Sequence, residues 1–376
     1  MEYSENRLNS VINSVRAPDR SVMDEAERRQ AQLAKPPGSL GRLEELAVQL
    51  CGIRGRMRPT VENKYLLVFC SDNGVTDEGV ASAPRSVTLA QTINLARGKT
   101  GGSVLARNIG CRLLVCDVGV DAEIREPGVI GRKIARGTAN IAKGPAMTRD
   151  MAVQAVLIGA DLASEAAAKG ADVIGIGEMG IGNTTTSSAV ISALTGAAVK
   201  DVTGRGGGIT DEMYRNKISV IERALRVNSP DGSDALDVLS KVGGFDIAAM
   251  AGAFIGSAAS RLPVIIDGFI AAAAALCAAR LCPAAADYMI PSHESYEIGY
   301  RVAMDELGKK PLFSLGMRLG EGSGCPIAMS MLDAACAVMN DMATFGEAGI
   351  DDGYLEPIRA IDAFSVDGSG EGKGTR

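Results

Sequence analysis

The hydrophobic positions of this chain change their period near residue 60. In residues 5 to 60, apolar side chains recur at helical spacing, as at Leu43, Leu46 and Leu50. The segment KPPGSL, residues 35–40, interrupts this pattern with a turn. We therefore expect this part of the chain to form amphipathic helices.

From Lys64 onward, short continuous apolar runs alternate with segments long enough for helices. The runs are residues 65–70, 112–118, 173–176, 264–266, 288–290 and 312–315. Continuous apolar strands separated by helices predict a parallel sheet with helices on both faces. Polar and glycine residues follow these runs, and ligands of open α/β sheets bind outside the carboxyl ends of the strands. The pattern predicts an α/β fold whose site is built from these loops.

The end of the chain has a different pattern. A last, buried helix is expected over residues 326 to 345, which are apolar on most faces. Residues 346 to 361 are expected to pack back on the N-terminal helices. The final segment SVDGSGEGKGTR, residues 365–376, is rich in glycine and polar residues and is expected to be a disordered tail.

Composition and charge exclude several classes of partner. The net charge of −6 gives no basic footprint for nucleic acid. The polar start MEYSENRLNSV predicts no secretory signal. The most apolar stretch, residues 262–282, is broken by a proline and two charged residues, which favours a buried strand and helix over a membrane span.

The eight cysteines include no C-x-x-C pair, and the chain has one histidine, so the spacing needed for a zinc site is absent. Buried, reduced thiols in a cytoplasmic protein are the simplest interpretation.

A first glycine loop follows the run at residues 173–176. Residues 175–180 match G-x-G-x-x-G, with Asp201 about twenty residues further on, as in dinucleotide-binding proteins. An NAD-dependent oxidoreductase is therefore one alternative, although the loop lies mid-chain, with no histidine or tyrosine nearby to handle a hydride. As a Walker A loop it has Asn183 where the lysine should be. The threonines that open the next helix suit a single phosphate at least as well as a pyrophosphate.

A second glycine loop, TGRGGGIT at residues 203–210, precedes Lys217. Successive glycines let backbone amides approach a ligand closely. Lys217 is a candidate cation for a phosphate, the alternative being a solvated lysine beside a plain linker.

Glu321 lies between two glycines in LGEGSGCP, residues 319–326. With no bulky neighbours in sequence it can face a cleft and act as a general base, or it can be an ordinary glutamate of a first helical turn. Ser292 and His293 are adjacent, but no third partner for a catalytic triad is evident. We interpret them as loop residues near the site.

These motifs together resemble the nicotinate-nucleotide:dimethylbenzimidazole phosphoribosyltransferase family. The resemblance extends from about Lys35 to Phe345. The segments that carry it are KPPGSLGRLE, SDNGVTDEGVASAPRSVT, RGTANIAKGPAMT, GEMGIGNTTTSSA, GRGGGITDEMYRNK, VIIDGFIAAAAAL and LGMRLGEGSGCPIAM.

The resemblance implies a homodimer with no metal and no nicotinamide cofactor. It implies a Rossmann-like catalytic domain, residues 61–345, and a small helical domain made from both chain ends, residues 1–60 and 346–364. The implied reaction moves ribose 5-phosphate from nicotinate mononucleotide to 5,6-dimethylbenzimidazole. Its products are α-ribazole 5'-phosphate and nicotinate, in cobalamin biosynthesis.

The resemblance also implies roles for individual residues. Glu321 matches the general base of the family, and Glu178 matches a second carboxylate of the site. The residues implied to hold the phosphate and ribose are Gly177, Gly180, Gly182, Asn183, Thr184, Thr185, Gly206, Gly207, Lys217 and Ser292. The residues implied to contact the base are Ser82, Gln91 and Leu315.

One departure concerns the acceptor base. Asn73 stands where many relatives have histidine, close to the expected base pocket. Adenine or phenolic acceptors therefore stay open beside dimethylbenzimidazole. A non-catalytic ribazole-binding protein on the same fold is a further alternative; it would lose the base, whereas Glu321 is present here.

Overall fold

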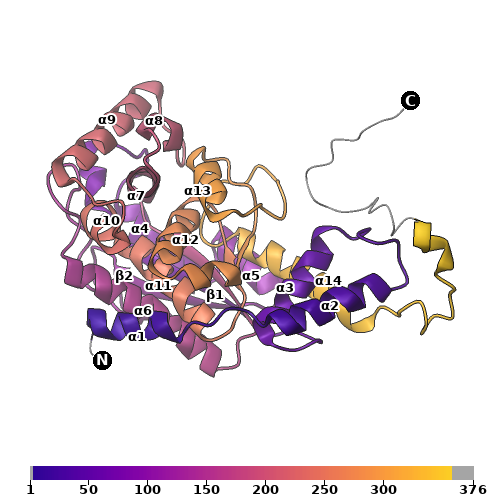
Figure 1. Ribbon diagram of the computed structural model, residues 1–376. Coiled ribbons are helices and arrows are strands. Elements are labelled where there is room, and N and C mark those ends of the chain that lie inside the picture. The colour runs from indigo at the N-terminus through magenta and orange to yellow at the C-terminus, as the bar shows by residue number, and fades with distance from the viewer. Residues whose placement is uncertain (1–2, 358–376) are drawn as a thin grey trace, which may run out of the picture. The chain divides into compact units, whose positions relative to one another are not determined.

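The computed structural model describes residues 3–357 of the chain (Figure 1). These residues form two compact units, a larger one of residues 3–17 and 62–330 and a smaller one of residues 18–61 and 331–357. The division into domains expected from the sequence stays a prediction, and the predicted tail, 365–376, lies outside the described residues.

The larger unit contains a parallel sheet of six strands in the order β3-β2-β1-β4-β5-β6. The strands are β1 (Lys64–Ser71), β2 (Arg112–Gly119), β3 (Val129–Gly131), β4 (Val173–Met179), β5 (Val264–Ile266) and β6 (Met289–Pro291). The predicted parallel α/β sheet is thus confirmed. The strand order reverses where β1 pairs with both β2 and β4, and such a switch point opens a crevice at the carboxyl ends of the strands.

Two details of the sheet differ from the sequence expectation. Val129–Gly131 pairs only with β2 at the edge of the sheet, and three partly exposed residues are too few to show a strand pattern. The run at 312–315 forms no strand of the sheet; Phe313 makes one isolated bridge to His293, and Leu315 is 63% exposed. Its apolar residues therefore do not form part of the buried sheet.

Helices surround this sheet, with α4, α11 and α12 each contacting the central strand β4. Those of the larger unit are α1 (Glu5–Ser14), α4 (Ser86–Ala96), α5 (Gly101–Asn108), α6 (Arg149–Ala168), α7 (Asn183–Thr195), α8 (Val199–Val202), α9 (Asp211–Asn228), α10 (Ala235–Val242), α11 (Phe245–Ala259), α12 (Phe269–Leu281) and α13 (Gly299–Leu307), with 3-10 helices at Gly74–Glu78 and Pro283–Tyr288. The helix α14 (Gly324–Asp341) begins in the larger unit and ends in the smaller one.

The predicted N-terminal helices also form, as α1 in the larger unit and as α2 (Arg20–Gln32) and α3 (Arg42–Arg54) in the smaller one. The α2 and α3 helices pack together in the smaller unit. The turn between them is tied to α3 by an ion pair of 2.7 Å between Lys35 Nζ and Glu44 Oε1, both largely buried. Since neither charge is well solvated, the pair restrains the predicted KPPGSL turn.

The helices α6 and α11 approach each other unusually closely. A Cβ added at Gly159 would lie 1.7 Å from the carbonyl oxygen of Ala249, and one added at Gly252 would lie 1.7 Å from that of Val156. Glycine at both positions lets the two backbones touch. Among the described residues, α6 is also the one helix long and apolar enough to cross a membrane, and 61% of its most apolar window is buried inside the fold.

We expect Gly159→Ala to destabilise the protein by about 3 kcal/mol or more, because the added methyl group must push α11 away from α6. Urea unfolding measures this as a lower free energy of unfolding. Gly144→Ala is the matched control, since a Cβ there meets no atom within 4 Å; its effect should stay within about 0.5 kcal/mol. Equal unfolding midpoints for the two variants would contradict the close helix contact.

Candidate active site

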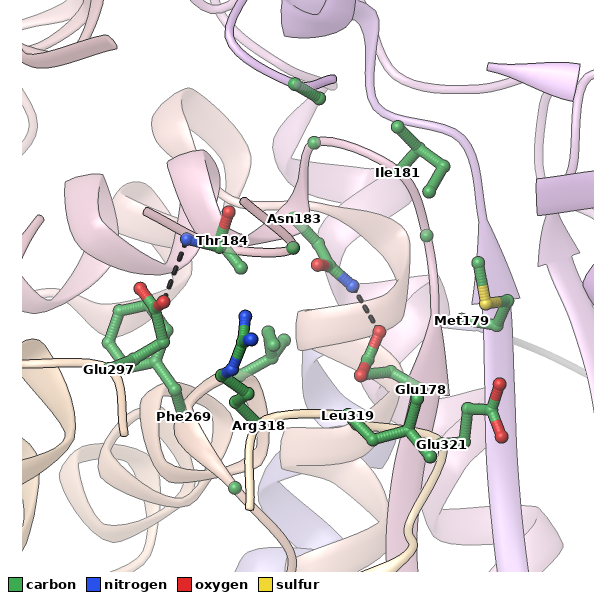
Figure 2. Close-up of a pocket in the computed structure, with 18 of the residues that line it drawn as sticks. Glu178, Met179, Ile181, Asn183, Thr184, Phe269, Glu297, Arg318, Leu319 and Glu321 are labelled. Carbon is green, nitrogen blue, oxygen red and sulfur yellow. Dashed lines mark hydrogen bonds between the residues drawn. The ribbon is translucent and has the colours of Figure 1, made fainter. Parts of the chain in front are cut away.

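A pocket opens at the carboxyl ends of β4, β5 and β6. Its lining comes from residues 80–91, 178–184, 205–209, 267–271, 293–297 and 318–321. Figure 2 shows Glu178 and Glu321 on one side of this pocket and Glu297 on the other, with Arg318 between them in this view. The pocket therefore lies where the strand order predicts a ligand.

Most of the residues singled out from the sequence are brought together in this lining. Those in the lining are Ser82, Gln91, Glu178, Gly180, Gly182, Asn183, Thr184, Gly206, Gly207 and Glu321. Leu315 lies outside it and is 63% exposed. Its assignment to the base stays a prediction.

Four further candidates lie behind the pocket wall. Thr185 is fully buried in the first turn of α7. The hydroxyl of Ser292 donates to the carbonyl of Asp267 at 2.8 Å. Gly177 lies in β4, where a Cβ would sit 2.4 Å from the amide nitrogen of Gly322. Lys217 is 1% exposed, so the alternative of a solvated lysine is wrong.

Glu321 is held in an uncommon backbone conformation. Its φ is +60°, between Gly320 at +84° and Gly322 at +71°. A residue with a side chain is rare in this left-handed region, and three in succession turn the chain sharply. Because α14 begins only at Gly324, Glu321 is not in the first turn of that helix, contrary to the ordinary-glutamate alternative.

The Glu321 carboxylate is 4% exposed and bonded to two neighbours. The amide of Gly102, in the first turn of α5, donates to Oε2 at 2.9 Å. The side-chain amide of Gln91 donates to Oε1 at 3.4 Å. The N-terminus of α5 and the long Gln91 contact thus orient a buried carboxylate that lines the pocket.

Glu178 belongs to a buried group of carboxylates that the sequence did not reveal. The side-chain amide of Asn183 donates to Glu178, as Figure 2 shows, and also to Asp246 Oδ2 at 3.2 Å. Burial, and then the nearby Asp246 carboxylate, raise the pKa of Glu178 to about 8. Burial also raises the pKa of Asp246 to about 6. Glu178 therefore holds a proton at neutral pH unless a cation binds beside it.

Asp267, directly after β5, supports the Glu321 loop. Its carboxylate accepts from the amides of Gly324 at 2.7 Å and Gly322 at 3.2 Å. Burial raises its pKa to about 7. The position of Asp267 at a strand end was a signal in the sequence that could have identified it as a site residue.

The single histidine is part of the pocket wall. The ring of His293 stacks on Phe313 with centroids 6.1 Å apart, and Nδ1 is 3.1 Å from the hydroxyl of Ser292. Burial lowers its pKa to about 4, so the imidazole is neutral. Since the Ser292 hydroxyl donates to the Asp267 carbonyl, the three residues do not form a catalytic triad.

The two glycine loops meet at the other end of the pocket. Lys217 Nζ donates to Thr184 Oγ1 at 2.8 Å and to the carbonyl of Gly204 at 3.3 Å, which joins the start of α7 to the second loop. Burial lowers the pKa of Lys217 to about 8. The amide of Gly206 donates to Glu297 Oε1 at 2.8 Å. The Gly206 amide, the Thr184 hydroxyl and the Lys217 ammonium group here form a cradle suited to an anion.

The structure argues against the dinucleotide interpretation of residues 175–180. Gly175 lies inside β4, and a Cβ there would be 2.6 Å from the side chain of Cys325. The first two glycines of the motif thus allow the start of α14 and the Glu321 loop to pack on the strand, and they do not form a strand-to-helix turn. Within residues 3–357, no group of three or more His, Cys, Asp or Glu side chains could hold a metal ion.

Comparisons with known proteins place the chain among phosphoribosyltransferases. The model of a family described as Phosphoribosyltransferase matches residues 15–350. A nicotinate-nucleotide–dimethylbenzimidazole phosphoribosyltransferase of Clostridium perfringens is 47% identical over 359 residues, covering 96% of this chain and 99% of its own. The protein of that name in Ruminiclostridium cellulolyticum is 50% identical over 340 residues, 90% of this chain and 97% of its own. The crystal structure of CobT from Thermus thermophilus has a TM-score of 0.85 and 39% identity, covering 89% of this chain and 100% of its own.

The protonation state of His293 gives a direct test of the pocket wall. We expect its imidazole NMR signals to stay unshifted between about pH 5.5 and 8, because an exposed histidine with a pKa near 6.5 would titrate there and a buried one would not. The chain has one histidine, so the signals need no assignment by mutation. A titration midpoint near pH 6.5 would show that the ring is solvated instead.

Proposed function

This chain belongs to the phosphoribosyltransferase family, and we propose from its pocket how it transfers ribose 5-phosphate from nicotinate mononucleotide to 5,6-dimethylbenzimidazole. The products are α-ribazole 5'-phosphate, for the lower ligand of cobalamin, and nicotinate. The observation that carries the mechanism is Glu321, a buried residue with left-handed backbone in the lining of the pocket. Backbone strain of this kind, in a residue other than glycine, is typical of functional sites.

The leaving group needs no acid. In nicotinate mononucleotide the ring nitrogen joined to C1' is positively charged, and when that bond breaks its electron pair stays on the nitrogen and neutralises the ring. The acceptor needs a base, because one nitrogen of the benzimidazole attacks C1' while the other loses its proton. We assign that proton to Glu321, which Gly102 and Gln91 hold in place. Attack on the face opposite the leaving group converts a β-linkage into an α-linkage.

The buried carboxylates suit the charge that develops at C1'. The ribosyl carbon becomes cationic as the bond to nicotinate lengthens, and a nearby anion stabilises it. Glu178 is the candidate closest to this role, with Asn183 orienting its carboxyl group. A cation beside Glu178 lowers the pKa that burial has raised, so the charged form of Glu178 is favoured as the transition state is approached.

We place the phosphate and ribose at the meeting point of the two glycine loops. Lys217, Thr184 and the amides near Gly206 provide the donors. The residues that complete this region in the proposal are Gly180, Gly182, Asn183 and Gly207 in the lining, and Gly177, Thr185 and Ser292 behind it. Holding both reactants in line would supply much of the remaining acceleration.

We place the base near Ser82 and Gln91, where Val80 and Val87 add apolar surface to the lining. Leu315 is kept as a further candidate. Asn73, which replaces a histidine of many relatives, is buried beneath the glycine loop, with its Cβ 3.6 Å from a Cβ built at Gly182. Since Asn73 is not in the lining, it could influence the base only through its neighbours.

A cytoplasmic homodimer is the proposed state of the protein. The family resemblance supports the dimer, and light scattering should give twice the mass of one chain. The eight cysteines are all free and buried, as expected, which is compatible with a reducing compartment.

The function is tested by nicotinate release. Purified protein is incubated with nicotinate mononucleotide and, separately, dimethylbenzimidazole, adenine, phenol and p-cresol, and the products are separated by chromatography. Release that depends on dimethylbenzimidazole, with a matching riboside phosphate, is expected. Release with another acceptor would change the base assignment, and tight nucleotide binding without any release would favour the ribazole-binding alternative.

Glu321→Gln should fold normally and lose about 10²- to 10⁴-fold in kcat, because an amide accepts no proton. Its Oε1 can still accept a hydrogen bond, so the loop is expected to keep its conformation. The control is Glu222→Gln, an exposed position on α9, which should leave kcat unchanged. An unaltered rate for Glu321→Gln would remove Glu321 from the role of base.

A further inference from the structure

The anion cradle described above already contains a carboxylate. Glu297 is 7% exposed, lines the pocket, and accepts the Gly206 amide through Oε1 at 2.8 Å. Its other oxygen, Oε2, is buried and has no hydrogen-bond partner. Figure 2 shows this side chain directed towards Thr184, at the start of α7. An acid with one unused and buried oxygen thus lies beside the groups that would bind a phosphate.

Two cations face this carboxyl group. They are Lys217, from α9, and Arg318, from the loop before α14. The guanidinium of Arg318 also lies over the ring of Tyr296, 5.9 Å from its centroid. A phosphate bound to Lys217 would bring a second anion close to Glu297, and two buried anions at short range repel each other unless a proton lies between them.

We propose that Glu297 binds the substrate phosphate as a carboxylic acid, donating a hydrogen bond from Oε2 to a phosphate oxygen while Oε1 keeps the Gly206 amide. The proton comes from solvent, and no covalent bond is made or broken. The pocket thereby binds a phosphate monoester with the uptake of one proton. This inference rests on the proposed function for the identity of the nucleotide, and it assigns Glu297 a role in specificity.

The environment of Glu297 supports this assignment. Burial raises the pKa of Glu297, while Lys217, the Gly206 amide and Arg318 act in the opposite direction. A phosphate dianion nearby would raise the pKa further, since it disfavours the charged carboxylate. Protonated Glu297 is therefore favoured in the complex, and phosphate affinity falls as the pH rises through the pKa of Glu297.

Inorganic phosphate is the probe, because it binds without turnover. In Glu297→Gln the amide oxygen can still accept from Gly206, and the amide nitrogen can donate to phosphate at every pH. We expect this variant to bind phosphate about tenfold more tightly than the unmodified protein at about pH 8.5, with the difference closing as the pH falls and Glu297 becomes protonated. Glu294→Gln, an exposed position three residues away, should behave like the unmodified protein.

Comparison between the variants isolates the proton that Glu297 takes up when phosphate binds. Lys217 and phosphate itself titrate in the same range, but both are common to all three proteins. Calorimetry in two buffers of different ionisation enthalpy, at about pH 7.5, should show that the unmodified protein takes up more protons than Glu297→Gln. Parallel pH profiles, equal proton uptake, or weaker binding by Glu297→Gln at every pH would each overturn the proposal.

Values of KM test whether Glu297 acts on the phosphate of the nucleotide. The KM of nicotinate mononucleotide should show the same pH-dependent difference between Glu297→Gln and the unmodified protein, whereas the KM of nicotinate riboside, which has no phosphate, should not. A difference that persists with the riboside would place Glu297 at the ribose instead and overturn the proposal. Failure of the proposed function would appear separately, as no nicotinate release by the unmodified protein, and would leave the phosphate titration unaffected.

Discussion

The site depends on the passage of one short loop across the end of a strand. Residues 320–322 all have left-handed backbone, and the loop crosses β4 where Gly177 has no side chain. On its other side, a Cβ at Gly102 would lie 2.3 Å from the carbonyl oxygen of Glu321. Asp267 holds the loop through two backbone amides. Because glycine is needed on both sides of the loop, the position of the Glu321 carboxylate is set by backbone packing more than by its own hydrogen bonds.

The two ends of the pocket hold different ionisable groups. Glu178 and Glu321 lie at one end, and Lys217 lies at the other, beside the glycine loops and Glu297. Burial raises the pKa of Glu178 and lowers that of Lys217, so both groups tend towards their neutral forms. In the proposed binding mode, the cationic ring and the anionic phosphate of the substrate favour the charged forms of Glu178 and Lys217 at once. The charges of the pocket therefore match those of the nucleotide better when the nucleotide is bound than when the pocket is empty.

Much of the fold could be predicted from the local pattern. Five of the apolar runs are strands of the parallel sheet, because strands buried on both faces are apolar throughout. The edge strand Val129–Gly131 was missed, since its residues are few and partly exposed. The run at 312–315 is apolar but forms no strand of the sheet, and its last residue, Leu315, is exposed. Local pattern therefore succeeds for the buried strands, including the edge strand β6, and fails for the short, partly exposed strand β3.

The candidate site was predicted less completely. Glu178, Lys217 and Glu321 were chosen through glycine motifs and family resemblance, and they lie in or directly behind one pocket. Asp246 and Glu297 gave no comparable signal, because each is significant only through residues far away in sequence. The motif at 175–180 was partly misleading, since a glycine that allows packing and a glycine that binds phosphate look the same in a sequence.

The sequence by itself determined the alternation of buried strands and helices, the glycine loops that end them, and the family to which the chain belongs. These follow from spacing along the chain, which reports the local backbone and which face of an element is buried. Only the tertiary structure decided that Lys217 is buried, that Asn183 bridges two carboxyl groups, and that Glu297 shares the cradle of the glycine loops. Burial and proximity set the charge of these groups, and both arise from contacts between segments that the chain brings together only when it folds.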